Sequence, residues 1–364
     1  MKKIRVAVVG LGFIGGCHID AIRRVFGTEI MAVSDVNEDA VNRYSSALGV
    51  KGYADYREML EREDIDALHD CTPNSMHYDV TKAAIEAGVH VYGEKPLAAT
   101  LEKGAELVRL ANGKGVFCAV NFNYRANAVV WEMRERLGRI PAEGGAGRCF
   151  LIHGRYLQDW LSRAEDYDWR VTEAGDGPRA LADIGSHWFD LARFVYGKKI
   201  VSVCAEPFVA YKTRIDKEVN SDDGAIVIAR FEDGLAASLV ISQVSNGYKN
   251  DLSISADCAE YSLRWRQQDA DKLIIGRRNG GEETIFTSSQ YFTGGAKERA
   301  TLPAGHPVGW ADSLKNSIQA FYDGLRSENS NCHNALCGFE DALWVMKVAD
   351  ACVRSGRSAK WVDV

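Results

Sequence analysis

The sequence predicts an α/β protein with two domains. The first is a doubly wound parallel sheet, and the second is an α+β domain built on a largely antiparallel sheet. Three observations predict this: apolar strands alternate with helices over residues 4–120, a G-x-G-x-x-G segment follows the first strand, and the alternation stops after Asn121. We therefore place the first domain at residues 1–122 and the second at 123–364, since 364 residues suit two domains.

Within the first domain, each short apolar run is followed by a helical pattern. The predicted strands are 4–9, 29–34, 67–71, 89–92 and 116–120, and the predicted helices are 13–25, 38–48, 57–62, 75–87 and 101–112. Gly113 is expected to close the last of these helices. Apolar strands of this length, joined by helices, are typical of a parallel sheet that is covered on both faces.

In the second domain, strands and helices no longer alternate regularly. We expect a long strand over 149–158, then several strands between 200 and 275 joined by turns such as Glu232-Asp233-Gly234. Strands that follow one another without crossover helices predict an antiparallel sheet. The predicted helices are 128–137, 183–194, 310–325 and 340–353.

Composition excludes several classes of protein. The net charge of −6 is spread along the chain and no Lys/Arg-rich tract occurs, so no nucleic-acid partner is expected. The nine cysteines are scattered without a C-x-x-C pair, which indicates reduced thiols and a cytoplasmic protein. The N-terminal apolar run ends at Gly10, which is too short for a membrane span or a secretory signal.

The segment Gly10-Leu11-Gly12-Phe13-Ile14-Gly15 has the context of a dinucleotide-binding turn. A strand precedes it, a helix follows it, and Asp35 ends the next strand, twenty residues after Gly15. The glycines allow a tight turn and a close backbone approach to a pyrophosphate. A carboxylate at Asp35 suits free ribose hydroxyls and would repel a 2′-phosphate, so NAD is favoured over NADP. The alternative is a glycine-rich turn with a surface aspartate.

Lys95 follows the predicted strand 89–92, in Gly93-Glu94-Lys95-Pro96-Leu97. Ligands of doubly wound sheets bind beyond the carboxyl ends of the strands, which places Lys95 near such a site. A lysine there can donate to a substrate oxygen. An ordinary strand-end lysine remains an alternative.

A second candidate group stands at the start of the helix predicted over 183–194. Asp183, His187 and Asp190 have a spacing that can place all three on one helix face. Oxidation of a carbinol needs a base that works near neutral pH, and histidine has a suitable pKa. Three alternatives stay open: Asp183 as a helix N-cap, His187 as a core histidine, and a metal site formed by the three residues.

Taken together, these motifs resemble the glucose–fructose oxidoreductase, inositol dehydrogenase and MocA family. The resemblance runs along the whole chain and includes Cys71-Thr72-Pro73-Asn74 with His77, the stretch ending in Glu94-Lys95-Pro96-Leu97, and the Asp-x-Gly-x-His block from Asp183. It implies a Rossmann domain followed by a domain with a largely antiparallel sheet, whose open face forms dimers or tetramers. It also implies that Lys95 and His187 are the catalytic pair, with Asp183 as the partner of His187.

The resemblance and the glycine motif together predict the cofactor contacts. These are Gly10, Gly12, Phe13, Ile14, Gly15, Asp35, Thr72, Pro73, Asn74, His77, Glu94 and Lys95. Asn74 could equally be only an N-cap. The peptide before Pro96 is often cis in this family, which would direct Lys95 toward the ligand.

Substrate contacts are predicted mainly from the strand 149–158. Alternation places Tyr156, Gln158 and Trp160 on one face, where aromatic rings and an amide suit a sugar ring. A similar block occurs in the branch that includes levoglucosan and other pyranose dehydrogenases. The alternative is an edge strand with aromatic packing. Further candidates are Tyr124 and Arg125 after the last Rossmann strand, and Trp169 in a long loop.

These features predict an NAD-dependent dehydrogenase that acts on a secondary hydroxyl or ketone of a sugar, anhydrosugar or cyclitol. A rival enzyme would keep NAD tightly bound and recycle it in each turnover. A rival from another class is a non-catalytic sensor of NAD and sugar, but such a protein has no need of a lysine, an aspartate and a histidine at this spacing.

Overall fold

The computed structural model describes residues 3–168, 170–171, 177–326 and 335–364. The chain forms two compact units. Unit 1 comprises Met1–Asn123 and Ala311–Leu343, and unit 2 comprises Tyr124–Trp310 and Trp344–Val364. Unit 1 thus contains a C-terminal segment that a boundary at residue 122 would leave in the second domain. None of the helices in the described ranges is long and apolar enough to cross a membrane.

Unit 1 is built on a seven-stranded sheet with the order β17-β6-β5-β4-β1-β2-β3. Its strands are β1 (Ile4–Val9), β2 (Thr28–Ser34), β3 (Lys51–Tyr53), β4 (Ala67–Asp70), β5 (His90–Gly93), β6 (Cys118–Val120) and β17 (Cys337–Gly338). All pairs are parallel except β17 with β6. The chain reverses its direction of winding between β1 and β4, which is the switch point where such sheets bind ligands.

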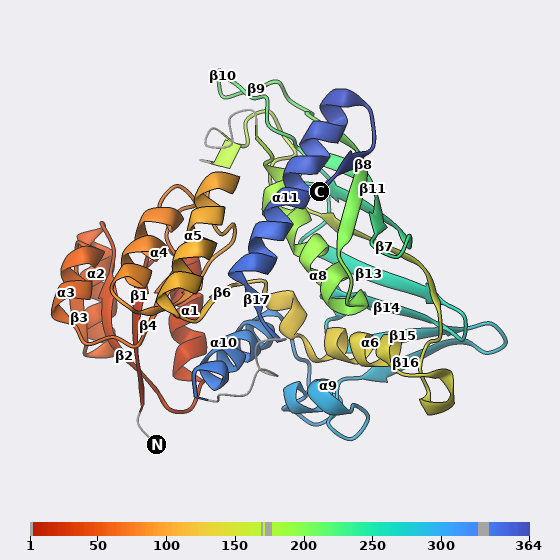
Figure 1. The fold of residues 1–364 in the computed structure, drawn as a ribbon, viewed down its shortest axis with the longest axis horizontal. Coiled ribbons are helices and arrows are strands. Elements are labelled where there is room, and N and C mark those ends of the chain that lie inside the picture. Colours follow the sequence, from red (N-terminus) through yellow and green to blue (C-terminus); the bar gives the residue numbers. More distant parts are fainter. Residues whose placement is uncertain (1–2, 169, 172–176, 327–334) are drawn as a thin grey trace. The chain divides into compact units, whose positions relative to one another are not determined.

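Most side chains of the strands in unit 1 are buried, which is why these strands are short apolar runs in the sequence. β4 is buried along its whole length. Its helices are α1 (Phe13–Arg23), α2 (Glu38–Leu48), α3 (Tyr56–Arg62), α4 (His77–Glu86), α5 (Leu101–Lys114) and α10 (Trp310–Arg326), the last apart from Trp310. Figure 1 shows these elements in red to orange and α10 in blue. The prediction that Gly113 closes α5 was wrong: the helix runs on to Lys114, and Gly115 closes it with a φ of 65°.

α10 comes from far along the chain, and specific contacts fix it to the Rossmann sheet. The Tyr322 hydroxyl lies 2.6 Å from His69 Nε2, and the Tyr92 hydroxyl lies 2.7 Å from Ser317 Oγ. Phe321 stacks on Phe117 with ring centroids 5.3 Å apart. These contacts join residues more than two hundred positions apart, and they explain why α10 belongs to unit 1.

Unit 2 is built on a nine-stranded sheet with the order β16-β15-β14-β13-β7-β12-β11-β8-β18. Its strands are β7 (Cys149–Leu157), β8 (Ile200–Phe208), β11 (Gly224–Phe231), β12 (Ala236–Ser242), β13 (Asp251–Cys258), β14 (Ser262–Arg266), β15 (Lys272–Arg277), β16 (Gly281–Phe286) and β18 (Val362–Asp363). Only β7 and β12 pair in parallel, so the predicted fold class is confirmed.

Helices cover one face of this sheet. α8 (Ser186–Tyr196) contacts β7 and β13, and α6 (Ala128–Gly138) contacts β14 and β15. Figure 1 shows α6 and α8 on the same side of the sheet. Unit 2 also contains α9 (Gly294–Arg299), most of α11 (Phe339–Ser358), and the two-stranded ribbon of β9 (Thr213–Arg214) and β10 (Lys217–Glu218).

Candidate active site

The predicted glycine turn joins β1 to α1, and its glycines differ in how much space surrounds them. Gly10 has a φ of 89°, and a Cβ there would lie 2.5 Å from the Cys71 carbonyl carbon. A Cβ on Gly15 would lie 1.9 Å from the Gly10 carbonyl oxygen. Gly12 is the exposed N-cap of α1 and has no side-chain cap, and a Cβ added to it would meet no atom within 4 Å. The turn therefore leaves an open approach to the helix N-terminus, which fits a dinucleotide pyrophosphate.

Asp35 lies just past β2 and connects to the glycine turn. Its Oδ2 accepts the Leu11 backbone N–H at 2.6 Å, and its Oδ1 accepts the Asn37 N–H at 2.8 Å. Each carboxylate oxygen keeps capacity for a further hydrogen bond. Asp35 can therefore hold the turn and still accept ribose hydroxyls. The Phe13 side chain is 84% exposed, so only its backbone belongs to the turn.

His77 joins the loops that follow β4 and β5. It is the first residue of α4 and is buried; Nδ1 lies 2.6 Å from the Pro96 carbonyl oxygen and Nε2 lies 2.8 Å from the Thr72 carbonyl oxygen. The peptide between Lys95 and Pro96 is cis, as the family resemblance implied. Because both ring nitrogens of His77 face these two carbonyls, we assign it to positioning the loops and not to direct contact with a cofactor.

Glu94, next to Lys95, is held by side chains that the sequence motifs did not single out. Its Oε1 lies 3.1 Å from His18 Nε2 and 2.6 Å from Asn121 Nδ2, and its Oε2 accepts the Lys95 N–H at 3.2 Å. Burial acts to raise the pKa of Glu94, but the contacts with His18 and Asn121 outweigh it, and the pKa is lowered. Glu94 is thus a carboxylate with a fixed orientation. In the sequence, the residue that could have indicated this contact is His18, three residues after Gly15.

In unit 2, three predicted residues form one aromatic cluster. The ring centroids of Tyr124 and His187 are 5.0 Å apart, and those of Tyr156 and His187 are 6.1 Å apart. The two tyrosine hydroxyls lie 3.0 Å from each other. Burial raises the pKa of Tyr124 to about 12 and that of Tyr156 well above its usual value, so both hydroxyls stay protonated. The cluster brings the predicted base together with two hydroxyl groups.

Amide side chains extend this cluster. Asn250, which no sequence motif indicated, accepts hydrogen bonds on Oδ1 from Gln158 Nε2 and, at 3.4 Å, from the Tyr156 hydroxyl. Trp160 Nε1 donates to Gln158 Oε1 at 2.7 Å. β7 ends at Leu157, one residue earlier than predicted, and the chain enters a turn at Trp160. The predicted substrate contact Trp169 lies outside the described residues.

Arg125 and Asp190 form a buried pair. The guanidinium donates to both carboxylate oxygens, with Nε 3.0 Å from Oδ2 and Nη2 bonded to Oδ1. This geometry favours a structural role for Arg125, which ties the segment before α6 to α8. It also argues against the metal alternative, because Asp190 is engaged by a cation. The described part of the chain contains no cluster of three or more His, Cys, Asp or Glu side chains suited to a metal ion.

Asp183 does not begin the helix as predicted. It lies in a π-helical turn over Leu181–Gly185, and α8 follows from Ser186, with Gly185 as an N-cap without a side-chain bond. The cause is the buried Asp222, whose carboxylate accepts the backbone N–H groups of Arg179 at 2.6 Å and Leu181 at 2.8 Å. Because Asp222 caps these N–H groups, the helical backbone begins before Asp183. Insertions of this kind often accompany functional sites.

The burial of Asp222 predicts how the stability of the protein depends on pH. Burial raises its pKa from 3.8 to about 7 in the folded protein. Because the folded state then holds the proton more tightly than the unfolded chain, the contribution of Asp222 to the free energy of unfolding should fall as pH rises from about 4 to about 7 and level off above that, by on the order of 4 kcal/mol. Asp222→Asn should flatten this part of the curve of unfolding free energy against pH. Urea unfolding at a series of pH values measures this curve, and Asp216→Asn, at an exposed position, is the control. If Asp222→Asn keeps the slope of the unchanged protein, the assignment is contradicted.

Both units match models of one protein family. Residues 4–122 match a model described as "Oxidoreductase family, NAD-binding Rossmann fold", and residues 135–264 match the GFO/IDH/MocA C-terminal domain. 1,5-Anhydro-D-fructose reductase of Ensifer adhaerens is 30% identical over 364 residues, covering 99% of this chain and 98% of that protein. This chain belongs to the GFO/IDH/MocA family. It is therefore an NAD-dependent oxidoreductase, and the predictions of family, enzyme class and cofactor are confirmed.

Two other proteins are similar over the full chain. Levoglucosan dehydrogenase of Pseudarthrobacter phenanthrenivorans is 25% identical, covering 100% of this chain and 99% of that protein. An inositol dehydrogenase homologue of Azotobacter vinelandii, solved with NADH and myo-inositol, has a TM-score of 0.88 at 25% identity, covering 100% of this chain and 98% of that one. Family membership favours catalysis over the sensor alternative.

Proposed function

We propose that this oxidoreductase converts a secondary hydroxyl of a pyranose, anhydrosugar or inositol into a ketone. The observation that carries the proposal is the cluster around His187, in which phenol hydroxyls, amides and a carboxylate stand together. Such groups suit the many hydroxyls of a sugar, and the aromatic rings suit its C–H faces. The names of the relatives, which include anhydrosugar and inositol enzymes, support the same class of substrate.

The residues of unit 1 are suited to hold NAD. The open N-terminus of α1 at Gly12 would bind the pyrophosphate, and Asp35 would accept the ribose hydroxyls. The loops tied together by His77 would bound the nicotinamide side, with Thr72, Pro73 and Asn74 on one loop and Lys95 on the other. When bound, NAD supplies the hydride acceptor. The protein supplies the groups that bind it and that manage the proton.

Three side chains are proposed to manage that proton. His187 accepts the proton of the substrate hydroxyl in the oxidative direction, since imidazole has a suitable pKa for this step. Asp183 stabilises the imidazolium that forms. Lys95 donates a hydrogen bond to the substrate oxygen and stabilises the negative charge that develops there.

Reduction of NAD by purified protein tests the proposal. A panel of levoglucosan, myo-inositol, other inositols, pyranoses and 1,5-anhydroglucitol covers the class. We expect at least one of these to produce the absorbance band of reduced nicotinamide. If the protein binds NAD but none of these compounds produces reduced nicotinamide, the proposed substrate class is contradicted.

The rival that recycles tightly bound NAD is distinguished by dialysis. If the cofactor exchanges, dialysed protein should depend on added NAD for activity. If the protein instead retains the nucleotide and reduces one carbonyl compound while oxidising a sugar, the recycling mechanism is correct.

Asp35 is expected to set the choice between NAD and NADP. Asp35→Ala should weaken NAD binding roughly tenfold, because it removes hydrogen bonds to a charged acceptor, and should narrow the difference from NADP. Calorimetric titration with both nucleotides measures this. Asp39→Ala, an exposed first-turn residue of α2, is the control. Unchanged discrimination would remove Asp35 from this role.

We also propose a cytoplasmic homodimer or homotetramer. Eight cysteines in the described ranges are free thiols, which supports a reducing compartment. The face of the nine-stranded sheet away from α6 and α8 exposes apolar side chains, including Ile226 at 56% and Ile228 at 49%. Exposed apolar surface of this kind is typical of subunit contacts. Light scattering of the purified protein gives the assembly mass, and a monomer would contradict the proposal.

A further inference from the structure

We propose that Gln243 and Arg179 are positioning residues that hold Asp183 as an oriented carboxylate. This inference rests on the proposed role of Asp183 beside His187. Gln243 follows β12 directly and is 0% exposed, so it has no surface with which to touch a substrate. Its Nε2 donates to Asp183 Oδ2 at 2.8 Å. The two residues are sixty positions apart, so only the fold brings them together.

Arg179 fixes the direction of that hydrogen bond. Its Nη1 lies 2.8 Å from Gln243 Oε1, and a guanidinium has donors but no acceptor. The atom of Gln243 that faces Arg179 must therefore be the oxygen, which turns the amide N–H groups toward Asp183. The same amide nitrogen lies 3.3 Å from Gln158 Oε1. A flipped amide would set an oxygen against the Asp183 carboxylate and leave Arg179 facing an N–H group.

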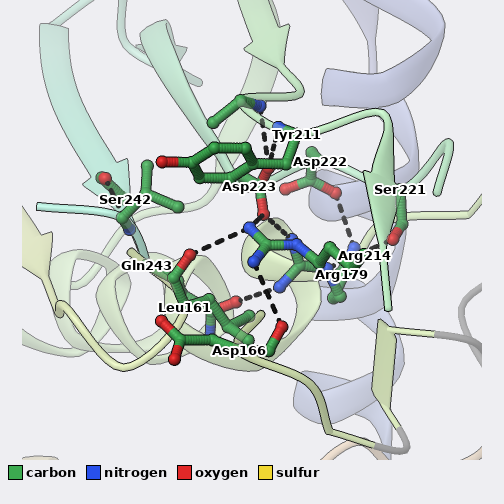
Figure 2. A network of polar contacts seen from close by, with 12 residues as sticks. Leu161, Asp166, Arg179, Tyr211, Arg214, Ser221, Asp222, Asp223, Ser242 and Gln243 are labelled. Atoms are coloured by element: carbon green, nitrogen blue, oxygen red, sulfur yellow. Dashed lines mark hydrogen bonds and ion pairs between the residues drawn. The ribbon is translucent and has the colours of Figure 1, made fainter. Parts of the chain in front are cut away.

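Arg179 is itself held in place by a buried charged cluster, which Figure 2 shows from close by. Asp223 Oδ1 accepts from Arg179 Nη2 and, at 2.9 Å, from Arg214 Nη2. Arg214 also donates to the carbonyl oxygens of Leu161, at 2.9 Å, and Arg163, at 2.6 Å. The guanidinium that orients Gln243 is thus fixed by charged bonds within the core, where rearrangement is costly.

The cluster also bears on the charge of Asp183. Two arginines face Asp223, and the second carboxyl, Asp222, has its pKa raised by burial to about 7. Near neutral pH the cluster is therefore neutral to positive. Together with the N–H groups of Gln243, this favours the ionised form of Asp183. An ionised, oriented Asp183 is the form that would stabilise a protonated His187.

Replacing Gln243 tests the inference. Gln243→Leu keeps the volume and removes the donor, so kcat should fall roughly tenfold to a hundredfold, the loss of one hydrogen bond to a charged group. NAD affinity should stay within about twofold, because this site belongs to unit 2. NMR titration of the His187 imidazole, without added nucleotide, should show its pKa lowered. A purely structural role for Gln243 would leave that titration unchanged.

Gln243→Glu provides a rescue that a packing role does not predict. The ionised glutamate repels Asp183, so activity should fall further than in Gln243→Leu above neutral pH. At acid pH the protonated carboxyl can donate to Asp183, so the activity of Gln243→Glu, relative to that of the unchanged protein at the same pH, should partly return. Tyr211→Phe, which removes only the hydrogen bond to the Ser162 carbonyl oxygen from the same neighbourhood, is the control and should resemble the unchanged protein.

Asp183→Asn separates the two claims. If Asp183→Asn turns over normally, the proposed role of Asp183 fails, and this inference fails with it. If Asp183→Asn is impaired while Gln243→Leu shows normal kcat and a normal His187 titration, only the positioning inference is overturned. Equal losses in Gln243→Leu and Tyr211→Phe would also overturn it.

Discussion

His187→Ala is expected to lower kcat by roughly 10²–10⁴-fold while leaving the affinity for NAD nearly intact. The reason is that a positioned general base contributes a rate factor of this size. His187 lies in unit 2, 5.0 Å from the ring of Tyr124, whereas the glycine turn and Asp35 lie in unit 1. Steady-state kinetics with the active member of the sugar panel gives kcat, and fluorescence titration gives the dissociation constant for NAD.

His153→Ala is the matched control for that experiment. His153 also lies in unit 2, on β7, but it is partly exposed and faces Asp257. Its removal should leave kcat close to normal. Near-normal turnover in His187→Ala would mean that another residue is the base, and equal losses in both variants would point to a general loss of structure.

Lys95→Ala is expected to lower kcat by roughly 10²–10³-fold, because it removes a donor to the oxygen on which charge develops. Lys95 follows Glu94, whose orientation is fixed by His18 and Asn121. Its backbone is therefore held by neighbours that the substitution leaves in place. The same kinetics measure the loss, and the melting temperature should change little.

Lys114→Ala, at the exposed end of α5, is the control for the lysine. It removes one positive charge from the same unit and should leave kcat unchanged. Retention of full activity by Lys95→Ala would assign the substrate oxygen to another donor. Loss of NAD binding in Lys95→Ala would show that the lysine acts on the cofactor and not on the substrate.

Local sequence signals predicted much of the first unit. The glycines at 10, 12 and 15 mark the turn because their spacing reflects local backbone demands, such as the positive φ of Gly10. The short apolar runs mark buried parallel strands for the same local reason. Family resemblance added the cis peptide before Pro96, which no local rule requires.

Features that depend on distant partners could not be predicted. The π-helical turn around Asp183 arises because Asp222 caps backbone N–H groups some forty residues away in sequence. The role of Gln243 follows from its contact with Arg179, and nothing around either residue in the sequence indicates that pairing. The placement of α10 with the Rossmann sheet likewise depends on contacts such as that of Tyr322 with His69.

Transfer of deuterium is the most direct test of the central claim, that this protein moves a hydride from a sugar carbinol carbon to NAD. Purified protein would be incubated with NAD and with levoglucosan or myo-inositol carrying deuterium on the carbinol carbons, and the nucleotide analysed by mass spectrometry. We expect deuterium in the reduced nicotinamide, and none with Lys95→Ala on the same timescale. Reduced nicotinamide without deuterium, or no reduction by a protein with NAD bound, would contradict the claim.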